Sequence, residues 1–321
     1  MGSRAPAAIV LTLALVLAAA GCAGPAASTG AGAASQPGSS RGLGQGGTPS
    51  PGGTLSPGSA PGTDGGPGTG GGPGTGTGRG TGTGTASPVS QVCGPPAAPG
   101  QLTSIRAADG VRLAAAAAGA GRRGVVLIPE LGPRGKCGWW DFAVYLARHG
   151  YHVLLFDHRC TGQSACPRGQ AANELMPDIQ GAVGWLRQHG AAQVALVGAS
   201  QGGSEALIAA ARPPRGVAGV AALSADELTT PLASRPYPGT AVRAAARLRL
   251  PALFAVARAD PYVSVPATRH LFARAGSRHK QLIVLGDQAG HGWDLVSAGF
   301  TGGTRPALRG AVLAFLHGIT S

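Results

Sequence analysis

Short apolar runs alternate with amphipathic helical segments from residue 101 to residue 319, and this alternation constrains the fold more than any other feature. The runs expected to be buried strands are 124–130, 152–159, 193–200, 216–223, 250–257 and 281–286. Helical spacing marks the segments 139–150, 178–190, 201–212, 265–276 and 305–319. Because parallel strands need helical connections that cover both faces of the sheet, the pattern predicts βαβ units around a mostly parallel sheet.

Two more strands are expected before this alternation begins. The turn Asp109-Gly110 separates residues 101–108 from residues 111–119, as in a β-hairpin. The prediction is therefore a sheet of eight strands. Ligands of such sheets bind beyond the carboxyl ends of the strands, so the residues that follow each strand are the candidates for chemistry.

The sequence GASQGG (198–203) places Ser200 where an expected strand turns abruptly into an expected helix. Such a corner has a strained backbone, and the residues two positions away on each side, Gly198 and Gly202, lack bulk. The N–H groups of the following helix point at the corner, which suits a serine oxygen that attacks a carbonyl. The alternative is a turn built from small residues without chemistry.

A serine hydroxyl needs a base to activate it, and the base needs a third group to orient it. Asp260 follows one expected strand, and His291 lies in the loop after the last expected strand. Ser200, Asp260 and His291 thus follow the chain order serine, acid, histidine. Asp226, which follows the preceding strand, is the alternative acid.

These residues give the chain a resemblance to the α/β-hydrolases over nearly all of residues 101–319. The motifs that carry it are GASQGG (198–203), ARADPYV (257–263) and GDQAGHGW (286–293). A fourth motif, FDHRCTGQS (156–164), is similar to the family segment Asp-x-Arg-Gly-x-Gly-x-Ser, with Cys160 in place of the first glycine. The resemblance implies an eight-stranded, mostly parallel sheet with helices on both faces.

The resemblance also implies roles for individual residues. Ser200 would be the nucleophile, His291 the base and Asp260 the acid, and the backbone N–H groups of Gln201 and Leu131 would form the oxyanion hole. Family members often have His-Gly before the second donor, where this chain has Pro129-Glu130. A glutamate there is unfavourable for a developing negative charge unless it points away or pairs with Arg134 or Arg159.

The expected activity is hydrolysis of carboxylic esters through an acyl-enzyme, on a small-molecule ester or acyl substrate. The alternatives are an acyltransferase or peptidase of the same fold, or a non-catalytic surface binding protein that retains it. Between Ser224 and Leu250 there is room for one helix and a short loop, so little or no cap domain is expected. No cofactor or metal is expected. The aromatic residues that could line an apolar pocket or pack the helices are Trp139, Trp140, Tyr237, Tyr262 and Trp293.

The N-terminal region has the pattern of an exported bacterial lipoprotein. Residues 1–21 have a positive start and a short apolar stretch, as in a signal peptide. The sequence AAGC that ends at Cys22 resembles the lipobox, so lipidation of Cys22 is expected, with plain secretion as the alternative. Residues 22–92 are expected to be the lipidated cysteine and a disordered tether, and residues 93–321 the hydrolase domain. The expected location is the outer face of the cytoplasmic membrane.

The number of cysteines predicts disulfides, and the net charge bears on the kinds of surface that the protein could bind. With Cys22 lipidated, four of the five cysteines remain, and in an oxidising compartment they are expected to form two disulfides. Three pairings are possible, and the favoured one joins Cys160 to Cys166 and Cys93 to Cys137. The net charge of +13 could favour anionic surfaces. No basic run is interleaved with aromatic residues, so nucleic-acid binding is not expected.

Overall fold

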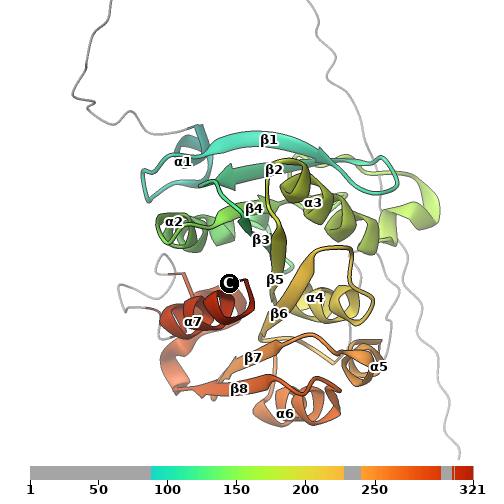
Figure 1. Ribbon diagram of the computed structural model, residues 1–321, viewed down its shortest axis with the longest axis vertical. Helices are drawn as coiled ribbons and strands as arrows, with labels where there is room; N and C mark the ends of the chain where they lie inside the picture. The colour runs from blue at the N-terminus through green and yellow to red at the C-terminus, as the bar shows by residue number, and fades with distance from the viewer. Residues whose placement is uncertain (1–87, 228–239, 298–305, 307, 321) are drawn as a thin grey trace, which may run out of the picture. The chain divides into compact units, whose positions relative to one another are not determined.

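A computed structural model of the protein describes residues 88–227, 240–297, 306 and 308–320 (Figure 1). The expected signal peptide, Cys22 and the tether as far as residue 87 lie outside the described residues. No helix among the described residues is long and apolar enough to cross a membrane.

The described chain contains a sheet of eight strands in the order β1-β2-β4-β3-β5-β6-β7-β8. The strands are β1 (Gln101–Arg106), β2 (Arg112–Ala118), β3 (Arg123–Ile128), β4 (His152–Phe156), β5 (Gln193–Ala199), β6 (Val217–Leu223), β7 (Ala252–Ala257) and β8 (Lys280–Leu285). β2 is antiparallel to β1 and β4, and the other neighbouring pairs are parallel. The predicted number of strands, the hairpin and the mostly parallel arrangement are confirmed.

Helices cover both faces of the sheet (Figure 1). One face carries α3 (Met176–Gln188), α4 (Gln201–Ala211), α5 (Thr240–Arg247) and α6 (Val265–Arg274). The other face carries α1 (Pro88–Cys93), α2 (Trp140–Arg148) and α7 (Arg309–Ile319). Between β6 and β7, α5 is the one helix among the described residues, and residues 228–239 of this connection lie outside them.

The central strands are buried on both faces, which explains why their sequences are continuous apolar runs. In β3, Val126 and Ile128 pack against the helices of one face, and Val125 and Leu127 pack against those of the other. All four side chains are fully buried. A strand that alternated apolar and polar residues could not occupy this position.

The packed structure includes α1, whose first five residues the sequence pattern places at the end of the tether. Val89 of α1 is fully buried, and the indole N–H of Trp140 donates a hydrogen bond to the carbonyl of Pro96. A disulfide joins Cys93 to Cys137, 44 residues further along the chain. These contacts explain why residues 88–92 pack with the domain although their composition resembles the tether.

The second disulfide joins Cys160 to Cys166, so both bonds of the favoured pairing are present. Cys160 has a φ of 63°, a left-handed conformation that favours glycine. This conformation gives a physical reason for the glycine that the α/β-hydrolases have at this position.

Candidate active site

Ser200 stands between the end of β5 and the start of α4, with φ 52° and ψ −123°. A non-glycine residue in this region is strained by roughly 1–3 kcal/mol, and such strain is common at active sites. The Ser200 N–H donates to the Leu223 carbonyl at 2.8 Å, which ties the corner to the neighbouring strand β6. The residue is partly exposed, as a nucleophile at this position would have to be.

The glycines on each side of Ser200 are required by close backbone contacts. A Cβ atom on Gly198 would lie 2.0 Å from the carbonyl oxygen of Gly202. One on Gly202 would lie 2.4 Å from the carbonyl oxygen of Pro129 and 2.5 Å from that of Ile128. The small residues predicted around the serine are therefore a steric necessity of this corner.

Asp260 and His291 meet at the same edge of the sheet. The Nδ1 atom of His291 lies 2.8 Å from Oδ1 and 3.0 Å from Oδ2 of Asp260. Oδ1 also accepts the N–H groups of Tyr262 and Val263, each at 2.9 Å. Burial alone would raise the pKa of Asp260, but the hydrogen bonds from His291, a serine hydroxyl and these two N–H groups lower it below its ordinary value. The carboxylate is thus ionised and can hold the imidazole.

Ser224 supplies that hydroxyl, and the sequence did not single it out. Its Oγ donates to Asp260 Oδ2 at 2.6 Å and accepts the Gly292 N–H at 3.0 Å. Ser224 is fully buried and has a φ of 48°, directly after β6. It therefore links the loop that carries the acid to the loop that carries the histidine. The alternative acid, Asp226, lies two residues further, and the His291 ring pairs with Asp260 instead.

The two loops bring His291 close to the corner at Ser200. A Cβ atom on Gly292 would lie 3.4 Å from the Cβ of Ala199, so the chain neighbours of the two residues are in contact. Among the described residues, the Ser200 hydroxyl makes no hydrogen bond to the His291 ring. The structure joins Asp260 to His291 directly and places Ser200 beside them.

The expected oxyanion donors follow the adjacent strands β3 and β5. Gln201 is the first residue of α4, so its N–H has no acceptor within the helix. Leu131 follows β3, which pairs with β5 so that Ile128 lies opposite Gly198. Leu131 is 41% exposed and lies in the open part of this loop.

Glu130 turns toward the histidine loop. Its Oε2 accepts the N–H of Trp293 at 3.3 Å and occupies the space beside Gly292. Burial raises the pKa of Glu130 to about 7, against the opposing effects of His291 and of the Trp293 N–H. Arg159, one of the two arginines considered as partners of Glu130, pairs with Asp178 and Asp109 instead.

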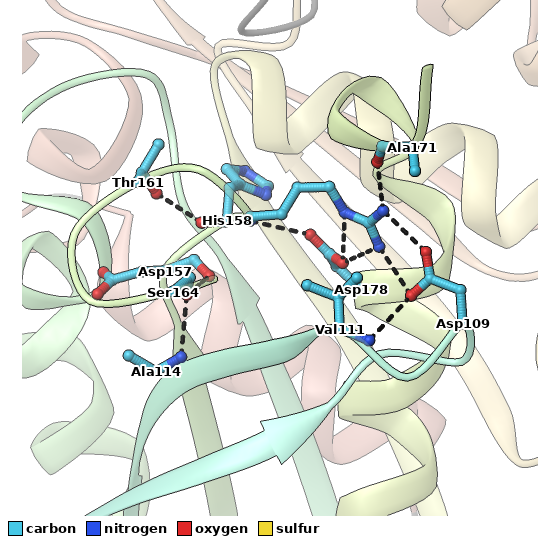
Figure 2. A network of polar contacts seen from close by, with 10 residues as sticks. Asp109, Val111, Ala114, Asp157, His158, Thr161, Ser164, Ala171 and Asp178 are labelled. Atoms are coloured by element: carbon cyan, nitrogen blue, oxygen red, sulfur yellow. Dashed lines mark hydrogen bonds and ion pairs between the residues drawn. The ribbon is translucent and has the colours of Figure 1, made fainter. Parts of the chain in front are cut away.

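Polar contacts fix the motif at residues 156–164, and Figure 2 shows part of this network. Asp157 accepts the backbone N–H of Lys136 at 2.8 Å and its ammonium group at 2.7 Å, in a buried ion pair. The fully buried guanidinium of Arg159 donates to Asp178 at 2.6 and 2.9 Å, and to Asp109 at 2.8 and 3.2 Å. These ion pairs fix the segment between β4 and α3.

Of the aromatic residues considered for the pocket, those described divide into residues packed in the core and one residue beside the site. Trp139 and Trp140 are buried on the face that carries α2 and α7, and Trp293 packs against Trp139. Tyr262 is 79% exposed, and its ring lies 4.8 Å from that of His291. Tyr237 lies outside the described residues. Tyr262 is therefore the candidate that flanks the site.

Comparisons with known proteins show the fold. A sequence model of the family described as alpha/beta hydrolase fold matches residues 124–271. An esterase from Pyrococcus furiosus is similar with a TM-score of 0.57 and 17% identity, over 70% of this chain and 91% of that chain. An enol-lactonase from Burkholderia xenovorans is similar with a TM-score of 0.52 and 18% identity, over 66% of this chain and 99% of that chain. The search among curated proteins found no match. The chain has the α/β-hydrolase fold, as its sequence predicted.

The described residues contain no group of three or more histidine, cysteine, aspartate or glutamate side chains that could hold a metal ion. What the site offers is a strained serine, an imidazole held by a carboxylate and free N–H groups at a helix start. This arrangement suits proton transfer and stabilisation of an oxyanion.

Proposed function

We propose that the protein is a serine hydrolase that cleaves carboxylic esters of small molecules through an acyl-enzyme. The observation that carries the proposal is the hydrogen bond between His291 Nδ1 and Asp260, beside a serine held at φ 52°. With Nδ1 donating to the carboxylate, the other ring nitrogen is the one that can accept a proton. That is the tautomer a general base needs.

In the proposed reaction, Ser200 Oγ attacks the ester carbonyl and its proton passes to His291. The N–H groups of Gln201 and Leu131 stabilise the oxyanion, and His291 then gives the proton to the leaving alcohol. Water activated by His291 releases the acid and restores the serine. The serine–histidine hydrogen bond is expected to form when substrate binds, since such bonds are often loose in free enzymes.

A serine-reactive fluorophosphonate probe tests the proposal. We expect the folded wild type to be labelled and to hydrolyse a panel of esters, and we expect Ser200→Ala to lose both properties. Ser204→Ala, which changes a buried serine on the same helix, is the matched control and should retain them. A folded wild type that is neither labelled nor active would favour a binding protein. Product analysis with added alcohols and with peptides separates hydrolysis from acyl transfer and from peptidase activity.

We also propose that the chain is exported and anchored through a lipid on Cys22. The two disulfides of the hydrolase domain support an oxidising compartment. Metabolic labelling with a fatty acid should mark the wild type and not Cys22→Ser. A wild type without the label that is released into the medium would favour plain secretion.

A further inference from the structure

A buried histidine and a buried glutamate connect the loop after β3, which carries one proposed oxyanion donor, to the start of α4, which carries the other. His158 lies two residues after β4 and is 2% exposed, and Glu205 lies in α4 and is also 2% exposed. The Nε2 atom of His158 is 3.2 Å from the carbonyl oxygen of Pro129 and 3.4 Å from Oε2 of Glu205. The other carboxylate oxygen of Glu205 accepts the side-chain N–H of Gln201 at 2.6 Å.

These contacts form a chain from one proposed donor to the other. Pro129 lies two residues before Leu131, and its carbonyl oxygen rests against Gly202, where a Cβ atom would be only 2.4 Å away. Gln201 carries the second donor on its own backbone. Three successive contacts, from Pro129 to His158, from His158 to Glu205 and from Glu205 to Gln201, therefore set the position of the loop after β3 relative to the start of α4.

His158 is itself held on both sides. Asp157 is fixed by Lys136, which lies in the same connection between β3 and α2 as Leu131. Arg159 is fixed by Asp178 and Asp109, which are labelled in Figure 2. The His158 ring also packs edge-on against Phe156 at 5.6 Å. A ring held in this way can fix a carbonyl group in place, whereas a mobile ring could not.

We propose that His158 and Glu205 are positioning residues of the oxyanion hole, which hold the N–H groups of Leu131 and Gln201 at the separation that the transition state requires. The inference rests on the proposed serine hydrolase function. It explains why a buried, ionisable pair is kept between Pro129 and the side chain of Gln201, where apolar residues would pack without the cost of desolvating polar groups.

The test compares steady-state kinetics of four variants. His158→Leu removes the donor to Pro129, and we expect kcat to fall about 10- to 100-fold with KM little changed, because the donors contribute mainly in the transition state. His158→Gln keeps an N–H donor and should recover most of the loss. Glu205→Gln keeps an oxygen to accept from Gln201 but puts an NH₂ group where Oε2 faces His158 Nε2, so it should also lower kcat.

His152→Leu is the matched control, because His152 is a buried histidine at the start of β4, whereas His158 follows the end of that strand. It should leave kcat nearly unchanged. The affinity for a boronic acid, whose tetrahedral adduct carries an oxyanion, should fall in parallel with kcat in His158→Leu and Glu205→Gln. Thermal unfolding checks that each variant is folded, and if His158→Leu does not fold, Glu205→Gln decides.

Wild-type kcat and boronate affinity in folded His158→Leu or Glu205→Gln would overturn the inference. So would an equal loss in His152→Leu, or a loss that His158→Gln does not recover. A wild type without hydrolysis and without labelling that depends on Ser200 would instead overturn the proposed function, and this inference with it.

Discussion

His291 and Asp260 are joined by the imidazole Nδ1 and both carboxylate oxygens, at 2.8 and 3.0 Å, although 31 residues separate them in the sequence. Each follows a strand of the parallel pair β7 and β8, so the sheet brings the two loops to one edge. Two backbone N–H groups and the Ser224 hydroxyl also bind the carboxylate, so its orientation is fixed independently of the imidazole.

Replacing the carboxylate by its amide tests the role of this contact. Asp260→Asn keeps the shape of the side chain but cannot stabilise a charged imidazole, so kcat for ester hydrolysis is expected to fall by about 10⁴. Asp226→Asn, the alternative acid, is the control and should retain activity. Loss of activity in Asp226→Asn with a fully active Asp260→Asn would contradict the assignment of the acid.

Much of the architecture could be predicted because the chain encodes it locally. The continuous apolar run of β3 indicates a strand buried on both faces, and GASQGG indicates a corner because only small residues avoid the close contacts at Gly198 and Gly202. The sequence also predicts that Asp260 and His291 lie near each other, because both follow strands and the carboxyl ends of parallel strands meet at one edge of the sheet.

The contacts between loops could not be predicted from the sequence in the same way. Nothing in the sequence distinguishes Ser224 from other serines that follow strands. Its role depends on a φ of 48° and on a hydrogen bond from Gly292, 68 residues away. The direction of Glu130 depends on which neighbouring loop offers an N–H group, and that is set by the tertiary structure. Periodicity identifies elements and faces, but it carries no information on which side chains meet between loops.

Ser224→Ala tests the link between the acid and histidine loops. The variant loses the hydrogen bond to Asp260 and leaves the Gly292 N–H without its acceptor, so we expect kcat to fall about tenfold through misplacement of the imidazole. Ser204→Ala removes another buried serine hydroxyl, which donates to the Asp226 carbonyl at 2.6 Å. Both variants should lose roughly 1–3 kcal/mol of stability in denaturant unfolding. Equal kcat values in the two variants would contradict a role for Ser224 in the site.

Gly198→Ala tests the steric requirement at the serine corner. The added Cβ would lie 2.0 Å from a backbone oxygen that cannot move without displacing α4. The free energy of unfolding is expected to fall by at least about 1–3 kcal/mol, and ester hydrolysis should be lost with it. Gly184→Ala in α3 is the control, because nothing lies within 4 Å of its added Cβ and the helix should gain roughly 0.5–1 kcal/mol. A fully stable, active Gly198→Ala would contradict the close backbone packing of this corner.

Glu130 makes stability depend on pH in a defined direction. Its pKa is about 7 in the folded chain, against an ordinary value of 4.5, because of burial. Between pH 4.5 and pH 7 the carboxyl group of Glu130 is mostly ionised in the unfolded chain and mostly protonated in the folded chain. The folded state therefore binds more protons, and its stability falls as pH rises. The loss attributable to Glu130 is at most about 3 kcal/mol above pH 7, since one pKa unit corresponds to about 1.4 kcal/mol.

Glu130→Gln keeps an acceptor for the Trp293 N–H and removes the titration. Denaturant unfolding at pH 5 and pH 8 should show wild type and variant with similar stability at the lower pH and the variant more stable at the higher pH. The ratio of kcat for the variant to kcat for the wild type should also rise with pH, because an ionised Glu130 opposes an oxyanion nearby. Glu174→Gln, at an exposed position, controls for the loss of one carboxylate. A stability difference that is the same at both pH values would show that Glu130 does not titrate in this interval.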